Sequence, residues 1–290
     1  MKTVFSIFFL LLIIRQTTAQ NLSVERIWRN YEFTAKSAGA YQMLKDGQHY
    51  VEWGGNGNLV KGDISDEAKS KEILILGTTL VWNDKPIEVA GFEFNASEDK
   101  VLLWTAPKAI YRRSFEAFYF LYDLNAKKLE ALDADHAPQT LAEYSPDGTK
   151  VSFIHGNDLF IKELKSGKVT KLTQDGKRNK IINGTTDWVY EEEFAITKAY
   201  CWSPDSKYLA FLKFDEREVP EFQMAMYGQL YPEQYTYKYP KAGELNSKVT
   251  LHLIDLKSLK IQGVEVGAYE YIPRLNWSSK SNQLVVQTMN

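Results

Sequence analysis

Two copies of a short pattern place the strongest constraint on how this chain of 290 residues can fold. YSPDGTKVSFI, from Tyr144, and WSPDSKYLAFL, from Trp202, share an aromatic residue, a polar Ser-Pro-Asp turn and an apolar strand. Pro at the second position of a turn, followed by Asp, is favourable turn chemistry. Weaker copies at Tyr41, Phe92 and Asn276 make the pattern recur about every 50 residues.

Short segments rich in β-branched and aromatic residues lie between these turns. They are residues 100–106, 117–124, 150–156, 158–164, 208–214, 249–256 and 283–289. Such segments, bounded by Gly, Asn, Asp, Ser and Pro, favour strands. A repeat of about 40–50 residues with four strands is typical of a β-propeller. We therefore expect an all-β chain with about five blades of an incomplete propeller, since five copies leave no strand to close the ring. Six tryptophans are expected in blade cores: Trp28, Trp53, Trp82, Trp104, Trp202 and Trp277.

The N-terminus has the pattern of a signal peptide. Lys2 supplies a positive charge, Val4 to Ile14 is apolar, and small residues follow near Ala19. The apolar run is shorter than the roughly 20 residues of a membrane-spanning helix. We predict a signal peptide at 1–20, a partial propeller at 21–290, and export to the periplasm or the exterior, with an uncleaved N-terminal anchor as the alternative. The single cysteine, Cys201, excludes an intrachain disulfide and is expected to be a buried, inert thiol.

The composition and the absence of several motifs argue against some classes of function. The net charge is −2, without a broad basic region, so a nucleic-acid partner is not expected. The sequence contains no Gly-x-Ser-x-Gly, no phosphate-binding loop and no His-Glu-x-x-His, and its four histidines are scattered. We predict no catalytic residue, no metal site and no cofactor within this chain.

The segment DWVYEEEF (187–194) is the strongest candidate site. Glu191, Glu192 and Glu193 follow aromatic residues, although consecutive glutamates normally form a solvated face. The apolar flanks favour burial, and acids fixed close together require a cation. An ammonium group has three donors and can bridge two carboxylates. The pattern therefore favours recognition of a free amino group by carboxylates that face a cavity.

This segment resembles the double-glutamate motif of the dipeptidyl peptidase IV family of serine exopeptidases. Four further segments are similar to that family and follow in its order: IYRRSFEAFYFLYDL (110–124), WSPDSKYLAF (202–211), DEREVPEF (215–222) and YTYKYPKAGELNSKVTLHLIDL (235–256). The resemblance covers most of residues 90–256.

The resemblance implies an eight-bladed N-terminal propeller followed by a C-terminal α/β-hydrolase domain that carries a Ser-Asp-His triad. This chain would supply the signal peptide and about five blades, and it would be inactive alone. None of the triad residues can be placed on this sequence, so the hydrolase domain is an expected partner outside it.

The resemblance also implies roles for individual residues. Glu192 and Glu193 would hold the free N-terminus of a substrate, and Arg112 would bind the carbonyl of its first residue. The family usually has His after this arginine, whereas this chain has Arg113, which leaves the choice between the two arginines open. Trp188 and Tyr190 are expected to anchor the segment, and Glu191 to be structural or solvated.

The function expected from these observations is release of N-terminal dipeptides, of the Xaa-Pro or Xaa-Ala type, from peptides with a free amine. A tripeptidyl peptidase of the same clan and a non-catalytic propeller acting as a binding or scaffold module are the alternatives. The Tyr-rich segment 231–244 is expected to pack over the propeller; contact with a neighbouring domain or with a second copy in a homodimer is the alternative.

Overall fold

The computed structural model describes residues 22–35, 41–66, 69–280 and 283–290, so the predicted signal peptide lies outside the described residues. The chain divides into two compact units, Met1–Tyr41 and Gln42–Asn290. The described part of the first unit holds one helical turn, η1 (Glu25–Arg29). Trp28, which lies in it, is 70% exposed; its prediction as a blade-core residue is wrong, because no sheet forms there to bury it. Within the described ranges, no helix combines the length and apolar character needed to cross a membrane.

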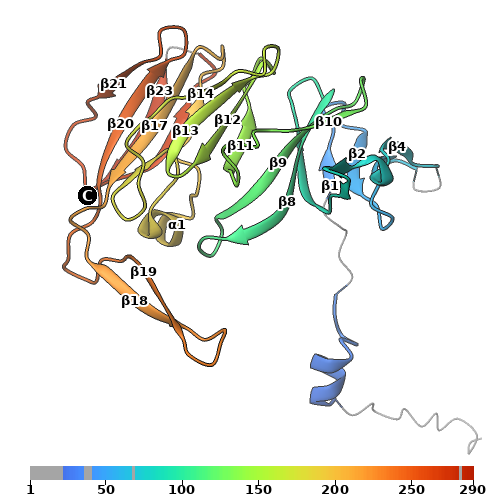
Figure 1. The fold of residues 1–290 in the computed structure, drawn as a ribbon, viewed down its shortest axis with the longest axis horizontal. Helices are drawn as coiled ribbons and strands as arrows, with labels where there is room; N and C mark the ends of the chain where they lie inside the picture. Colours follow the sequence, from blue (N-terminus) through green and yellow to red (C-terminus); the bar gives the residue numbers. More distant parts are fainter. Residues whose placement is uncertain (1–21, 36–40, 67–68, 281–282) are drawn as a thin grey trace, which may run out of the picture. The chain divides into compact units, whose positions relative to one another are not determined.

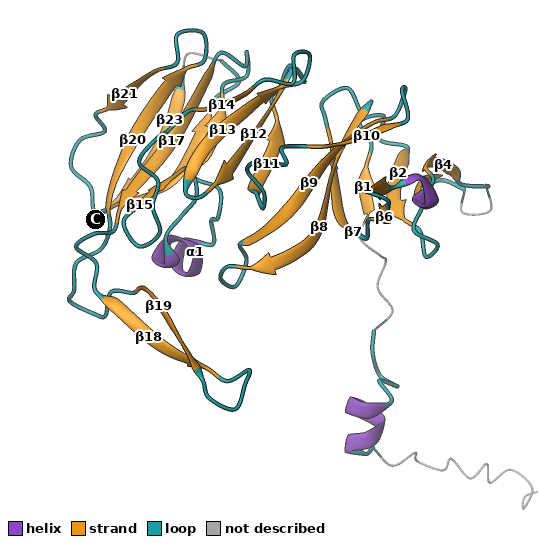
Figure 2. Ribbon diagram, viewed as in Figure 1, coloured by secondary structure: helices purple, strands orange, loops and turns teal. Residues whose placement is uncertain are grey.

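The second unit is built almost wholly from antiparallel sheets, as Figures 1 and 2 show. The first sheet contains β1 (Tyr41–Met43), β2 (His49–Trp53), β3 (Leu59–Asp63) and β4 (Glu72–Ile75). After the short η2 (Gly77–Thr79) and the small ladder of β5 (Val81–Trp82) and β6 (Lys85–Pro86), the second contains β7 (Val89–Phe94), β8 (Lys100–Ala109), β9 (Phe115–Asp123) and β10 (Lys128–Ala131). The third contains β11 (Thr140–Tyr144), β12 (Lys150–His155), β13 (Asp158–Glu163) and β14 (Val169–Lys171).

The fourth sheet contains β15 (Ile181–Asn183), β16 (Tyr200–Trp202), β17 (Tyr208–Asp215), β20 (Lys248–Asp255) and β21 (Lys260–Val264). A separate hairpin, β18 (Glu221–Met226) and β19 (Glu233–Lys238), leaves it between β17 and β20. The last pair is β22 (Tyr271–Trp277) and β23 (Leu284–Met289). Five successive sheets confirm the predicted all-β chain of an incomplete propeller.

The hydrophobic cores lie between consecutive sheets. Between the second and third, Leu102 and Leu121 pack with Phe153 and Phe160, all 6% exposed or less. Equivalent clusters join the first sheet to the second, the third to the fourth, and the fourth to β22–β23. Burying one such side chain contributes about 1.5–3 kcal/mol. Face-to-face packing of successive sheets is the arrangement of propeller blades.

The repeated polar turn closes the first hairpin of the third and fourth sheets by the same hydrogen bonds. Ser145 Oγ donates to Asp147 Oδ1 (2.6 Å) and accepts from Lys150 N (2.9 Å). Ser203 Oγ donates to Asp205 Oδ1 at 2.7 Å in the next copy. The sequence repeat therefore reflects a hydrogen-bonded turn that fixes the start of each second strand.

An insertion interrupts the first strand of the fourth sheet. β15 and β16 both pair with β17, on either side of Leu212, and residues 184–199 leave the sheet between them. Gly184 N donates to Leu212 O (3.0 Å), Leu212 N donates to Ala199 O (2.8 Å), and Ala199 N donates to Gly184 O (2.9 Å). These bonds close the base of the insertion, so its tip is held at one end of the sheet.

Candidate functional site

The glutamate segment forms a short helix, α1 (Trp188–Phe194), which the sequence patterns did not predict. Asp187 caps its N-terminus: Oδ1 accepts the Tyr190 N–H at 2.9 Å, and Oδ2 accepts the Ser247 hydroxyl at 2.6 Å. The helix ends at Ala195, which adopts a left-handed conformation with φ 56°. An Asp cap satisfies a free backbone donor of the first turn. The cap, together with burial, therefore allows a helix of seven residues to persist.

Aromatic side chains hold α1 against its surroundings. Tyr190 is 2% exposed, its ring lies 4.8 Å from that of Phe214, and its hydroxyl accepts the Ile272 N–H at 2.9 Å. Phe194 packs edge-on against Tyr190 at 5.1 Å. Trp188 is half-buried and its ring lies 4.3 Å from that of Tyr239, which follows β19. The helix is thus fixed to β17, to β22 and to the chain after β19.

The two arginines lie in the turn between β8 and β9. Ser114 closes this turn: its carbonyl accepts the Ile110 N–H (2.8 Å) and its hydroxyl accepts the Tyr111 N–H (3.3 Å). β8 and β9 form a long hairpin, and its turn lies beside α1 (Figure 1). Residues about 80 positions apart in the sequence therefore meet at one place.

The three glutamates have three different environments. Glu191 is 1% exposed, so it is not solvated; its Oε1 accepts the backbone N–H groups of Arg113 (2.6 Å) and Ser114 (2.9 Å). Glu192 forms an ion pair with Arg112, whose Nε lies 2.9 Å from Oε2 and 3.1 Å from Oε1. Glu193 is exposed, and its carboxylate has no hydrogen-bond or ion-pair partner among the described residues.

The remaining predicted residue, Arg113, is exposed, and its guanidinium donates to the Glu191 carbonyl oxygen at 3.4 Å. The structure therefore brings together all seven residues singled out in the sequence, on α1 and on the Tyr111–Ser114 turn. A guanidinium and a paired carboxylate, with an unpaired carboxylate one residue further along α1, can bind a group that carries both an ammonium and a carbonyl.

A cavity of about 310 Å³ adjoins this cluster. Tyr111 and Ser114 line it from the β8–β9 turn, Thr185 and Thr186 from the insertion, and Glu216 from the chain after β17. Glu192 and Glu193 are not among its lining residues, so the expectation that they face a cavity does not hold for it. Burial, and next the Asp187 carboxylate, raise the pKa of Glu216 to about 7.

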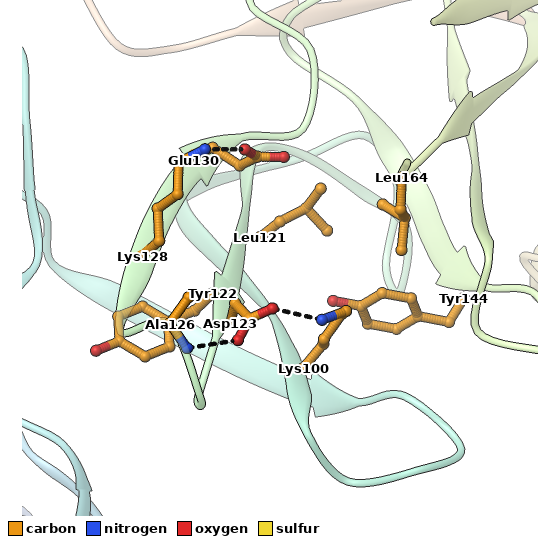
Figure 3. A pocket seen from close by; sticks show the side chains of 9 residues that line it. All are labelled: Lys100, Leu121, Tyr122, Asp123, Ala126, Lys128, Glu130, Tyr144 and Leu164. Carbon is orange, nitrogen blue, oxygen red and sulfur yellow. Dashed lines mark hydrogen bonds and ion pairs between the residues drawn. The ribbon is translucent and has the colours of Figure 1, made fainter. Parts of the chain in front are cut away.

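A second cavity, of about 180 Å³, lies between the second and third sheets (Figure 3). Lys100 and Asp123, which form an ion pair at 2.5 Å, line it together with Tyr144. It contains none of the predicted site residues, and Lys100 and Asp123 lie at the end of the β8–β9 hairpin farther from the arginine turn. Within the described ranges, no group of three or more His, Cys, Asp or Glu side chains is arranged to hold a metal ion.

The sequence patterns missed several residues that shape the site. Asp187, Ser247 and Tyr239 fix α1, and Ser114 closes the arginine turn. Asp is a preferred cap residue, and three good helix formers, Glu191 to Glu193, follow Asp187 within six residues, so a signal for a capped helix was available there. Ser247 gave no local signal, and Tyr239 was predicted only as part of the packing segment 231–244, because both residues reach α1 only through the fold.

The sheets and this insertion define the described chain as part of a β-propeller that carries a charged site at one end of its fourth sheet. Comparison with known proteins gives the same class. Residues 95–290 match the family described as Dipeptidyl peptidase IV (DPP IV) N-terminal region.

Named relatives and a solved structure agree with this match. The chain is 32% identical, over 76% of its length, to a probable dipeptidyl-aminopeptidase B from Talaromyces marneffei. It is 31% identical, over 72% of its length, to the prolyl endopeptidase FAP of Homo sapiens. A crystal structure of Porphyromonas gingivalis dipeptidyl peptidase 4 superposes with a TM-score of 0.86 at 33% identity, covering 93% of this chain and 39% of that one. The chain belongs to the dipeptidyl peptidase IV family, and it spans about a quarter of the length of these curated relatives (26% and 27%).

Proposed function

We propose that this chain is the substrate-recognition part of an exported serine dipeptidyl peptidase, which releases Xaa-Pro or Xaa-Ala dipeptides from peptides with a free N-terminus. The observation that carries the proposal is the ion pair of Arg112 with Glu192, beside the unpaired carboxylate of Glu193. Membership of the family supports the peptidase assignment.

The chemistry of a peptide N-terminus suits this cluster. An α-amino group has a pKa of about 7.7–8.0 and is largely protonated near neutral pH. Its three donors can be shared between Glu193 and the oxygens of Glu192. Arg112 uses Nε on Glu192, so its terminal nitrogens keep donors for the carbonyl of the first residue.

Fixing the amine also fixes where the chain is cut. In an extended peptide the carbonyl of the second residue lies two residues, roughly 7 Å, from the N-terminal amine. A nucleophile held at that distance from the amine site therefore releases a dipeptide. A blocked N-terminus would offer no ammonium to Glu193 and would leave Glu192 with Arg112 as its single partner, which disfavours binding.

The proposal requires a partner that this chain does not supply. We place the Ser-Asp-His triad on a C-terminal α/β-hydrolase domain of the same protein and assign no catalytic residue to the chain itself. Export by the N-terminal segment, peptide substrates and a homodimer belong to the same proposal.

One relative favours a second candidate. The human relative is named a prolyl endopeptidase, a term for enzymes that cut within a chain. An endopeptidase of this kind would cleave a substrate whose N-terminus is blocked. A non-catalytic scaffold is the other alternative, and it would lack Gly-x-Ser-x-Gly followed by Asp and His in the gene beyond Asn290.

The test uses the full-length gene product and an unblocked Xaa-Pro amide substrate. Because each variant removes a charge that faces the ammonium, Glu192→Gln and Glu193→Gln should each lower kcat/KM at least about tenfold. Glu265→Gln, on an exposed residue, is the matched control and should have no effect. Unchanged kcat/KM in both site variants would rule out amine recognition, and equal cleavage of an N-acetylated substrate would favour the endopeptidase.

A further inference from the structure

We infer that Glu191, the first and buried glutamate of the triplet, is a positioning residue that sets α1 against the arginine turn and so aligns Arg112 with Glu192. The inference rests on the proposed function, because alignment matters only if the cluster binds substrate. It assigns no contact between Glu191 and the substrate.

The geometry of Glu191 differs from that of its neighbours. Its side chain points away from solvent, is 1% exposed, and accepts two backbone N–H groups of the turn through one oxygen. Its own backbone carbonyl accepts from the Arg113 guanidinium at 3.4 Å. Among the described residues, the other hydrogen bond between α1 and the turn joins Arg112 to Glu192.

These bonds connect two elements that belong to different sheets. The turn ends the β8–β9 hairpin of the second sheet, whereas α1 is inserted in the first strand of the fourth. The Arg112 side chain is 70% exposed and long, so its ion pair with Glu192 is a weak constraint on the position of the turn. A buried carboxylate that receives two backbone donors is a stronger constraint.

The turn also needs this acceptor. The N–H groups of Arg113 and Ser114 donate to Glu191 and not to a residue of the β8–β9 hairpin, and Ser114 is 7% exposed. Without Glu191 both donors lose their partner, and a buried donor without a partner is costly. The turn would then move to find another acceptor and carry Arg112 away from Glu192.

The experiment measures kcat/KM of the full-length protein on the Xaa-Pro amide, normalised to the amount of reactive nucleophile. A small organophosphonate that labels the nucleophilic serine counts correctly folded enzyme without using the amine site. Glu191→Ala should lower normalised kcat/KM at least about tenfold, because both backbone donors lose their acceptor. Glu191→Gln keeps a carbonyl oxygen for both donors and should retain at least about a third of the wild-type value. Glu265→Ala is the control for loss of a glutamate.

A double-mutant cycle separates positioning from a merely structural role. In an Arg112→Ala background there is no guanidinium to align, so adding Glu191→Ala should cost less than about threefold. Three results would each overturn the inference. Glu191→Ala could lower kcat/KM by the same factor with and without Arg112. Glu191→Gln could be as defective as Glu191→Ala, or Glu191→Ala could be fully active. If Glu191→Ala does not fold, Glu191→Asp replaces it, since a shorter carboxylate keeps the charge but loses reach.

Failure of this inference is distinguishable from failure of the proposed function. If Glu192→Gln impairs cleavage while Glu191→Ala does not, only the positioning role is wrong. If Glu192→Gln and Glu193→Gln both leave kcat/KM unchanged, amine recognition itself is wrong.

Discussion

At the scale of single residues, Glu216 is the described side chain whose titration is best placed to affect stability near neutral pH. It is 4% exposed, and burial is the main cause that raises its pKa from 4.5 to about 7. The Asp187 carboxylate raises the pKa further, whereas Lys238, the Asn179 N–H and Arg178 lower it. The folded protein therefore holds a proton on Glu216 at pH values where the unfolded chain has lost it.

The direction of the pH dependence follows from linkage. The folded protein binds the Glu216 proton more tightly than the unfolded chain does. This proton therefore stabilises the fold fully below about pH 4.5, and the stabilisation is lost as the pH rises through about 7. Glu216→Gln should remove this contribution to the pH dependence and raise the free energy of unfolding at pH 8 by about 1–3 kcal/mol. Thermal unfolding between pH 5 and 8 measures it, with the exposed Glu218→Gln as control. A Glu216→Gln variant with the wild-type pH profile would contradict the assignment.

At the scale of the element, α1 depends on its cap more than on helix propensity. Seven residues are too few for an isolated helix in water. Asp187→Ala removes the acceptor of the Tyr190 N–H and of the buried Ser247 hydroxyl, and should lower the free energy of unfolding by about 2 kcal/mol. Asp187→Asn keeps an acceptor for the cap and should cost less than about 1 kcal/mol. Urea denaturation measures both, and equal losses would show that the cap is not the cause.

Local sequence patterns predicted the strands of the blades but not the helix α1. The blades were predictable because the Ser145 and Ser203 turns are local: each closes by hydrogen bonds within five residues. The helix was missed because its local signal is limited to the Asp187 cap, and the contacts that bury it come from Ser247 and Tyr239, which are distant in the sequence.

The site residues divide in the same way. Their resemblance to a known motif singled out Glu192, Glu193 and Arg112, and the fold brings them together. The buried state of Glu191 was not predictable, since it follows from a turn 78 residues earlier in the chain whose backbone donors need an acceptor.

At the scale of the whole molecule, the β18–β19 hairpin projects from the fourth sheet, and its tip packs against no other part of the described chain. Its base packs as expected for the Tyr-rich segment: Tyr237 is 6% exposed and Tyr239 contacts Trp188. Its tip does not, because Tyr227, Leu230 and Tyr231 are 83%, 91% and 81% exposed. The hairpin extends away from the fourth sheet in Figure 1, and its ladder contains two strands only.

The homodimer included in the proposed function is predicted to form through this tip. Exposed aromatic and apolar side chains gathered in the turn of a projecting hairpin favour association with a like surface. The double variant Tyr227→Ser with Leu230→Ser should convert a dimer to a monomer, measured by light scattering after size-exclusion chromatography, while the unfolding temperature stays within about 2 °C. Ile64→Ser, on an exposed apolar residue of a distant loop, is the control and should leave the mass unchanged. A double variant that stays dimeric would place the contact elsewhere, because a surface that carries the association cannot lose two of its most exposed apolar side chains without effect. A wild-type protein that is monomeric at micromolar concentration would contradict the homodimer itself.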